Sequence, residues 1–304
     1  MVQDKSLKST PKACLPWQRS KRYRNRLNHA LLKTAKPVRK ILKNATDIVF
    51  PPHCIACNTE LQRSKEERFL CPGCWRLHHL SLLRNTATCL RCALPLPALN
   101  APGARNQFWT TAPSDPTPAL ICPHCLASPP AFQRCRAVVS YELLPSKLIT
   151  KLKTQHKLIV ANFIAEQLSS LFHTAPASAE KILSKPQIDA LLPVPLHANR
   201  IKLRGFNQAE EIARCLGKQL SIPMLSDALT RLYDTPSQQL LSRHQRQKNL
   251  RGAFRANDMM LAGKHLAIID DVITTTSTAR EVASTVCKGG AASCEIWSYA
   301  RTAE

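Results

Sequence analysis

The sequence lacks several features that would place it in a familiar class of protein. It has no uninterrupted apolar run near the roughly 20 residues that a membrane span needs, and no apolar segment of a secretory signal follows its first residues. Acidic residues are scarce, since 20 Asp and Glu stand against 43 Lys and Arg, a net charge of +23 that excludes an acidic tail. With 44% hydrophobic residues the chain is globular rather than fibrous or collagen-like. We therefore expect a soluble, cytoplasmic and strongly basic protein.

The length of 304 residues predicts two domains, or one domain with large appendages, at roughly 150 residues per domain. Residues 1–46 hold 13 Lys or Arg and a single acid, Asp4, residues 47–135 are rich in cysteine, and residues 136–304 have the composition of an ordinary α/β domain. We expect the first part to be a basic, mostly disordered arm. It is either a solvated tail or a segment that binds phosphate backbone, with Trp17 and Tyr23 available to stack on bases.

Eight of the 13 cysteines form four C-x-x-C pairs, a spacing at which a tight turn points both sulfurs at one metal ion. Disulfide or redox chemistry is the alternative, but four pairs within 72 residues favour two closed, structural zinc sites. The pairing stays open, because sequential, crossed and nested arrangements use the same turns. Most of the other five cysteines are expected to be small core residues. The predicted zinc ligands are Cys54, Cys57, Cys71, Cys74, Cys89, Cys92, Cys122 and Cys125.

Apolar runs alternate with helical spacings in the last part of the chain, which predicts a mostly parallel sheet with helices on both faces. The expected strands are 137–141, 188–194, 266–269 and 294–299. One or two helices are expected between 144 and 171, and others from Asn207 onward, over a basic stretch at 238–250, and from about 278 to 288. Asn207 and Glu210 have the spacing of a capping box, and Gly289 with Gly290 predicts the end of the last helix.

The segment LAIIDDVITTTSTAREV, Leu266 to Val282, holds the residues best suited to chemistry. A buried strand delivers Asp270 and Asp271 to the carboxyl edge of the sheet, where open α/β folds bind ligands. Two acids suited to a sugar diol or Mg²⁺, beside a phosphate cradle, predict a ribose-phosphate pocket; an acidic loop edge without a ligand is the alternative. The cradle would consist of hydroxyls and N–H groups at the N-terminus of the next helix, from Thr274, Thr275, Thr276, Ser277 and Thr278.

This segment resembles the signature with which type I phosphoribosyltransferases bind phosphoribosyl pyrophosphate (PRPP): an apolar strand, two acids and a loop rich in Thr and Gly. The sequence departs from that pattern at Thr276, where the family usually has glycine. None of the eight glycines lies between Gly263 and Gly289. If this position needs a positive φ, a β-branched Thr is strained there and its side chain crowds the phosphate.

Other segments make the resemblance more specific. The chain is similar to the ComF/GntX family, and most of all to its GntX-like branch, in four segments that occur in the family's order. The resemblance implies a double zinc ribbon fused to a type I phosphoribosyltransferase-like domain, in a family associated with natural competence and with the use of DNA as a nutrient. The segments are PPHCIAC, YELLPSKLITKLK from Tyr141, LLPVPLHANRIKLRGFNQAEEIA from Leu191 and RLYDTPSQQLLSRHQRQKNLRGAF from Arg231.

The resemblance also implies roles for single residues. Asp270 and Asp271 would hold ribose hydroxyls and Mg²⁺, and Thr274 to Thr278 would hold the 5′-phosphate. Arg200 and Arg204 become candidates for contacts to pyrophosphate or DNA phosphate, with a solvated surface role as the alternative. If the domain is catalytic, Asp271 is the best candidate for a general base while pyrophosphate leaves on Mg²⁺.

The five residues 204–208 have a second interpretation as a structural corner. In that interpretation Gly205 makes the turn, Phe206 packs and Asn207 caps the following helix.

We interpret the chain as a factor of DNA uptake or DNA utilisation that binds single-stranded DNA through basic surfaces and carries a ribose-phosphate pocket. One alternative is an active phosphoribosyltransferase acting on an acceptor that the sequence does not identify. The other is a non-catalytic module with a degenerate pocket, which docks a partner such as a helicase or a DNA-channel component.

Overall fold

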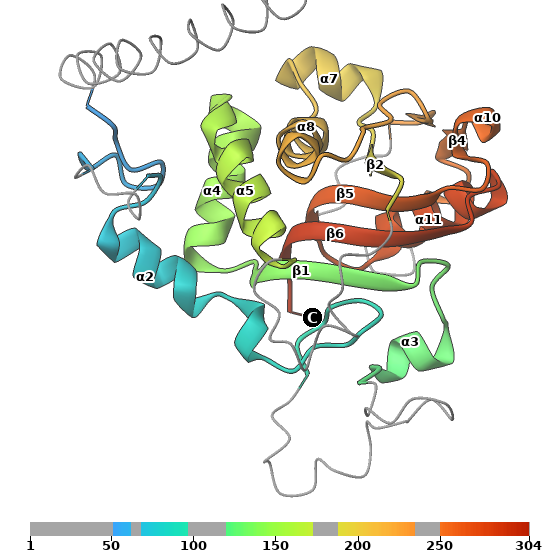
Figure 1. Ribbon diagram of the computed structural model, residues 1–304, viewed down its shortest axis with the longest axis horizontal. Coiled ribbons are helices and arrows are strands. Elements are labelled where there is room, and N and C mark those ends of the chain that lie inside the picture. The colour runs from blue at the N-terminus through green and yellow to red at the C-terminus, as the bar shows by residue number, and fades with distance from the viewer. Residues whose placement is uncertain (1–50, 62–67, 97–119, 173–187, 235–249, 304) are drawn as a thin grey trace, which may run out of the picture. The chain divides into compact units, whose positions relative to one another are not determined.

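The computed structural model describes residues 51–61, 68–96, 120–172, 188–234 and 250–303 (Figure 1). The predicted basic arm, with Trp17 and Tyr23, lies outside these ranges. So does the predicted basic helix at 238–250, apart from its last residue, Leu250, which is fully buried. From His53 onward the chain forms one compact unit.

Four parallel strands form the central sheet, in the order β1-β6-β5-β2. All four expected strands are confirmed, although their ends differ. The expected strand at 266–269 is longer, because β5 continues to pair with β6 as far as Ile273, which lies opposite Arg301. The acids Asp270 and Asp271 therefore lie inside the strand rather than in the loop that follows it. The strands are β1 (Arg134–Ser140), β2 (Ala190–Pro193), β5 (His265–Ile273) and β6 (Ser293–Arg301).

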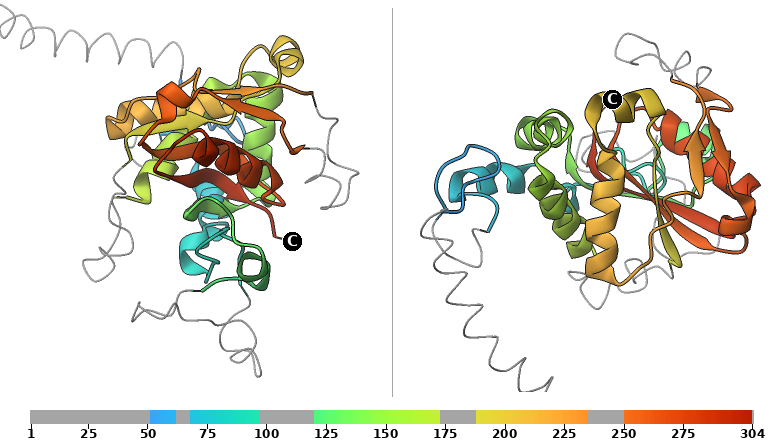
Figure 2. Two further views of the ribbon diagram at one scale, coloured as in Figure 1. Left: turned by 90° about the vertical axis from the view of Figure 1, so that its right-hand side faces the viewer. Right: turned by 90° about the horizontal axis from the view of Figure 1, so that it is seen from above.

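Helices cover both faces of this sheet (Figure 2), which confirms the expected architecture. Side chains alternate along a strand, so Ala267 and Ile269 pack with α4, α5 and α8 on one face, while Leu266 and Ile268 pack with α11 on the other. The helices are α4 (Leu143–Gln155), α5 (Leu158–Ser170), α8 (Gln208–Leu220) and α11 (Ser277–Lys288).

The helix ends follow local chemistry. The side chain of Asn207 accepts a hydrogen bond from the N–H of Ala209 at 3.1 Å, which caps α8 as expected. The last helix, α11, begins at Ser277, one residue before the expected position, and Thr276 occupies its N-cap position. It ends before Gly289 and Gly290, and Gly290 has a φ of 91° that suits glycine.

Several short elements have no counterpart among the predicted ones. Two of them, α2 and α3, begin directly after a cysteine with proline in the first turn, a favourable start for a helix. None of the described helices is long and apolar enough to cross a membrane. The short elements are α2 (Pro72–Leu80), η1 (Leu83–Asn85), α3 (Pro123–Ala127), α7 (Ala198–Arg204), β3 (Leu229–Arg231), β4 (Phe254–Ala256) and α10 (Asp258–Leu261).

Candidate functional site

Two adjacent carboxyl groups lie near the carboxyl end of β5. Asp271 is 4% exposed, and Asp270 is half-buried. The backbone N–H of Asp271 donates to Oδ1 of Asp270 at 2.9 Å. Burial, and then the neighbouring charge of Asp271, raise the pKa of Asp270 well above its usual value. A cation or a sugar diol beside Asp270 would favour its charged form.

Lys153 of α4 reaches across to this strand and forms an ion pair with Asp271, with 2.6 Å between Nζ and Oδ2. Burial works against the charge of Lys153, but the attraction of Asp271 and then of Asp270 outweighs it and raises the pKa of the lysine. The ammonium of Lys153 thus occupies one carboxyl oxygen of Asp271.

The loop after β5 leads into α11 through an unusual backbone conformation. Thr276 is buried and has a φ of 62° and a ψ of 0°, in the left-handed region that favours glycine. A glycine, which the family usually has at this position, would adopt this positive φ without strain. The hydroxyl of Thr276 accepts a hydrogen bond from Nε of Arg280 at 3.2 Å, and Oγ1 of Thr275 lies 3.0 Å from Oγ of Ser277.

The start of α11 has two features that suit an anion. The side chain of Thr276 makes no capping hydrogen bond to the helix, and the first turn holds no acidic residue. N–H groups at a helix N-terminus and the helix dipole both favour a phosphate at such a position. Ser277 and Thr278 are the first two residues of α11.

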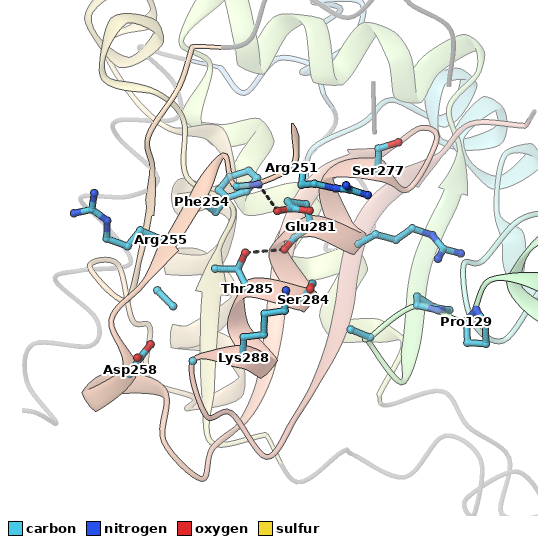
Figure 3. A pocket seen from close by; sticks show the side chains of 16 residues that line it. Pro129, Arg251, Phe254, Arg255, Asp258, Ser277, Glu281, Ser284, Thr285 and Lys288 are labelled. Carbon is cyan, nitrogen blue, oxygen red and sulfur yellow. Dashed lines mark hydrogen bonds between the residues drawn. The ribbon is translucent and has the colours of Figure 1, made fainter. Parts of the chain in front are cut away.

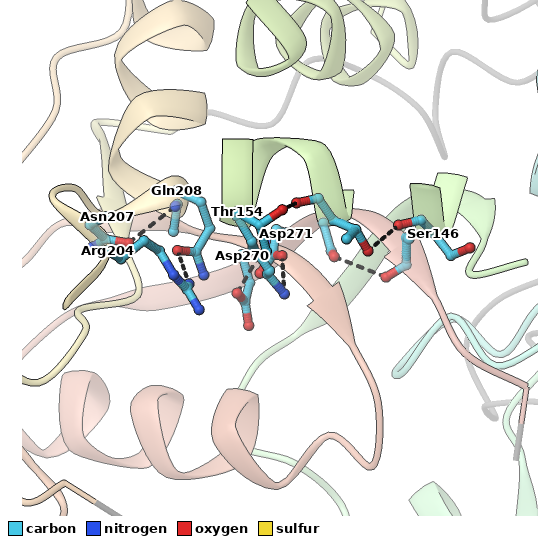
Figure 4. Close-up of polar contacts among 12 residues, drawn as sticks. Ser146, Thr154, Arg204, Asn207, Gln208, Asp270 and Asp271 are labelled. Carbon is cyan, nitrogen blue, oxygen red and sulfur yellow. Dashed lines mark hydrogen bonds and ion pairs between the residues drawn. The ribbon is translucent and has the colours of Figure 1, made fainter. Parts of the chain in front are cut away.

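The two candidate arginines of α7 are engaged within the protein. Arg204 donates from Nη1 to Oε1 of Gln208 at 2.6 Å (Figure 4). Nε of Arg200 lies 3.0 Å from Oδ1 of Asp234. A ligand phosphate would have to compete with these contacts.

Residues 204–208 form the structural corner that the sequence allowed as an alternative. Gly205 ends α7 with a φ of 83°, and the ring of Phe206 packs 5.1 Å from the ring of His156. Asn207 caps α8 and also donates to the carbonyl oxygen of Val194 at 3.0 Å. These contacts account for the residue types of the segment without a ligand.

The structure adds residues to the site that the sequence did not single out. Lys153 is one, although it lies in the YELLPSKLITKLK segment of the family resemblance. Arg231, at the end of β3, is another. Burial and then the charge of Arg200 lower its pKa, while the charges of Asp234 and Asp270 oppose that shift. Arg231 therefore lies within electrostatic reach of these two acids. Only the fold brings these residues to β5.

The eight predicted zinc ligands form two clusters of four sulfur atoms, each cluster with all its sulfurs within 4.8 Å of one another. Tetrahedral zinc with bonds of about 2.3 Å places its sulfurs about 3.8 Å apart, so both clusters fit the ion. The pairing is sequential, which settles the alternatives that the sequence left open. The first cluster is Cys54, Cys57, Cys71 and Cys74, and the second is Cys89, Cys92, Cys122 and Cys125.

A groove of about 950 Å³ runs beside the exposed side of α11 (Figure 3). The segment 251–258 forms one wall, and Pro129, Pro130 and Ala131 form part of the other. Four cationic and two acidic side chains line it, so its charge is positive overall. They are Arg251, Arg255, Arg280, Lys288, Asp258 and Glu281.

Comparison with known proteins places the chain in a family. Residues 45–107 match the double zinc ribbon domain, a range that ends before Cys122 and Cys125. The DNA utilization protein YhgH of Escherichia coli O157:H7 is 34% identical over 225 residues, which cover 70% of this chain and 96% of the relative. The chain belongs to the ComF/GntX family. Competence protein F of Haemophilus influenzae is 28% identical over 250 residues, which cover 82% of this chain and 96% of that protein.

Two solved structures are similar to parts of the chain. They are the glutamine PRPP amidotransferase of B. subtilis, with 17% identity and a TM-score of 0.30, and the UMP synthase of Leishmania donovani, with 14% identity and a TM-score of 0.27. The matches cover 45% and 52% of this chain but only 26% and 23% of those proteins. The chain thus corresponds to about a quarter of the length of each structure.

Proposed function

We propose that this member of the ComF/GntX family acts in DNA uptake or DNA utilisation, binds single-stranded DNA, and holds a ribose phosphate of the PRPP type at the end of β5. The division into a double zinc ribbon at 47–135 and a phosphoribosyltransferase-like domain at 136–304 is part of this proposal. The names of the relatives, DNA utilization protein and competence protein, support a role in this process.

The pocket proposal depends above all on one observation. Two adjacent carboxyl groups, one of them with a raised pKa, precede a left-handed turn and the uncapped start of a 12-residue helix on the same strand–loop–helix unit. Carboxylates accept hydrogen bonds from a ribose diol, and the N–H groups at the helix start donate hydrogen bonds to phosphate oxygens. A ribose 5-phosphate presents both groups to one site.

Mg²⁺ fits the same arrangement. It prefers oxygen ligands and is commonly held by one or two carboxylates together with the phosphates of the substrate. Asp270 would be the carboxylate available to it, because Lys153 already neutralises Asp271. The ion would supply charge to a departing pyrophosphate if the domain catalyses a transfer.

The experiment that tests the pocket is a calorimetric titration of PRPP with Mg²⁺ into the zinc-loaded protein. We expect binding in the wild type and its loss in the Asp270→Asn, Asp271→Asn double variant, since that variant lacks the charges that hold the diol and the ion. The matched control is Asp227→Asn with Asp258→Asn, which makes the same change of charge at two exposed acids outside the pocket.

Each result has a clear meaning. Binding that survives in the Asp270→Asn, Asp271→Asn variant contradicts the pocket. No binding in the wild type favours the non-catalytic module, with Thr276 as the physical reason. Release of pyrophosphate with an added nucleobase or amine favours the active transferase.

Positive charge supports the DNA part of the proposal. The arm at 1–46 supplies much of the net charge of +23, and four cationic side chains line the groove beside α11. Ser277 and Arg280 belong to both the groove and the start of α11. A phosphodiester backbone in this groove would place its end near the phosphate cradle.

A further inference from the structure

Arg301, the last residue of β6, joins the second cysteine cluster to the loop after β5. It is 1% exposed. Its Nε donates to the carbonyl oxygen of Cys92 at 2.9 Å, and its Nη1 donates to the carbonyl oxygens of Ile273 and Thr274. One buried guanidinium thus links the backbone of a cluster residue to the backbone of the loop.

Arg280 makes a second link, through side chains. Its Nε donates to the hydroxyl of Thr276, and its Nη2 donates to the sulfur of Cys125 at 3.7 Å. The planar guanidinium holds its donors in fixed directions, so the position of the sulfur constrains the position of the threonine. Thr276 is the residue in the left-handed conformation.

The turn between the two cysteines of a C-x-x-C pair is called a knuckle. The packing of the Cys89–Cys92 knuckle supports both links. Ala93, which follows Cys92, is buried in the same apolar cluster as Ile273 of the loop and Ala279 of α11. The N–H of Cys122 donates to the sulfur of Cys89 at 3.3 Å, an arrangement that holds the two knuckles together. Four thiolates around one Zn²⁺ carry net negative charge, which strengthens the hydrogen bond from Arg280.

We propose that the second cysteine cluster holds the loop Ile273–Thr276 in its ligand-ready conformation, with Arg280 and Arg301 as positioning residues. The zinc of this cluster then has a role beyond the stability of its own ribbon. The inference rests on the proposed function, because it takes this loop as the site of phosphate binding.

The first cluster supports a different part of the molecule and provides an internal control. Its residues Cys54 and Cys74 are buried in the apolar cluster of α4 and α5. Lys151 of α4 donates to the carbonyl oxygens of Ile55 and Ala56 in the first knuckle. Loss of this cluster should therefore loosen α4 rather than the loop after β5.

The test is hydrogen–deuterium exchange of the backbone amides of 270–281 in the full, zinc-loaded chain. We expect exchange about tenfold faster in Arg280→Ala and in Cys122→Ser with Cys125→Ser, because a charge-assisted hydrogen bond of the loop is lost in each. Metal analysis should find both zinc ions in the first variant and one fewer in the second. Lys288→Ala, on the same helix, should leave the exchange unchanged.

The matched control is Cys54→Ser with Cys57→Ser, which removes the other zinc ion. Its faster exchange should be confined to the first ribbon and α4. If this variant speeds exchange in 270–281 as much as the Cys122 and Cys125 variant does, general loss of stability explains the effect and the inference is overturned. Unchanged exchange in Arg280→Ala, which keeps both metals, overturns it as well.

A titration of PRPP into the same variants separates this inference from the proposed function. If the wild type does not bind PRPP, the proposed pocket fails, yet the exchange data still decide whether the cluster holds the loop. If the wild type binds, Arg280→Ala should weaken binding about tenfold, the factor that corresponds to one such hydrogen bond. Wild-type affinity in that variant would overturn the positioning role.

Discussion

At the scale of single residues, Thr276 shows a conflict between local preference and local structure. A left-handed backbone costs a residue other than glycine about 1–2 kcal/mol, and a branched Cβ adds crowding. The surrounding structure maintains this conformation: the residue is 4% exposed, and Arg280 binds its hydroxyl. Strain of this kind persists where neighbouring contacts fix the backbone.

Replacement of Thr276 by glycine should improve phosphate binding. In the Arg280→Ala background, where the hydrogen bond to the Thr276 hydroxyl is already lost, glycine adopts a φ of 62° without strain and removes a side chain from beside the cradle, so we expect PRPP affinity to rise about fivefold, the equivalent of roughly 1 kcal/mol. Calorimetry measures the change. Thr274→Gly is the matched control, because Thr274 lies outside the left-handed region, so glycine there relieves no strain and removes a hydroxyl of the predicted cradle. A fall in affinity in Thr276→Gly would show that the hydroxyl itself contributes to binding.

The sequence predicted some residues of the site and could not predict others, for reasons of distance along the chain. Asp270, Asp271 and the hydroxyl run are contiguous, so a local pattern was enough to find them. Lys153 belongs to a helix whose own spacing gives no sign of a partner on β5. The pairing of the cysteines was equally hidden, because every arrangement uses the same two-residue knuckle.

At the scale of elements, the long strands and helices could be predicted from the sequence, whereas the short elements could not. The buried strands and the helices α4, α5, α8 and α11 follow from apolar runs and helical spacing, because their side chains pack against the sheet. The short helices α2 and α3 begin at cysteines of the knuckles, so metal ligation and a proline set them rather than any periodicity. The ends of β5 and β6 depend on their mutual pairing, which the sequence of one strand does not contain.

Helix α2 carries a buried titratable group into the core. His78 is fully buried, and its ring stacks 6.0 Å from that of Tyr299 and meets Phe163 edge-on at 5.2 Å. Within the described residues neither ring nitrogen has a hydrogen-bond partner. Burial, and then the charges of His79 and Arg84, lower the pKa of His78 to about 4.

This burial predicts a dependence of stability on pH. Because the folded-state pKa lies below the ordinary value of 6.5, the unfolded chain takes up a proton first, and stability falls as the pH drops from 6.5 towards 4. Between pH 8 and 5.5 we expect His78 to account for a loss of about 1.4 kcal/mol in the free energy of unfolding. His78→Phe should lack this loss in denaturant titrations at the two pH values.

The control for this prediction is Leu80→Phe, since Leu80 is exposed on the same helix and carries no titratable group. It should keep the pH dependence of the wild type. An equal difference between wild type and His78→Phe at both pH values would show that His78 does not titrate as its burial requires.

At the scale of the whole molecule, both cysteine clusters are in contact with the sheet domain in the part from His53 onward. One cluster packs with α4 and α5, and the other is hydrogen-bonded to the end of β6 and the start of α11. Of the acids of β5, Asp271 pairs with Lys153 of α4, and both acids precede the loop that leads into α11. Under the proposed function, this arrangement gives a physical reason for fusing a double zinc ribbon to this sheet.

The net charge of +23 gives the last prediction, which concerns DNA. Binding of a fluorescent single-stranded oligonucleotide should weaken steeply with salt, because each neutralised phosphate releases counterions. The triple variant Arg251→Ala, Arg255→Ala, Lys288→Ala should lower the slope of log affinity against log salt by about 2, at roughly 0.7 per phosphate contact on a single strand. Anisotropy titrations at several salt concentrations measure this slope.

The control variant is Lys147→Ala, Lys202→Ala, Lys218→Ala, which removes the same charge from exposed positions that do not line the groove. A specific groove requires the two triple variants to differ, because a general loss of positive charge lowers both slopes equally. The slope that remains in the groove variant then belongs to other cations, the arm at 1–46 foremost among them. Equal slopes in the groove variant and the wild type would remove the groove from the DNA-binding surface, and no salt dependence at all would contradict DNA binding by this chain.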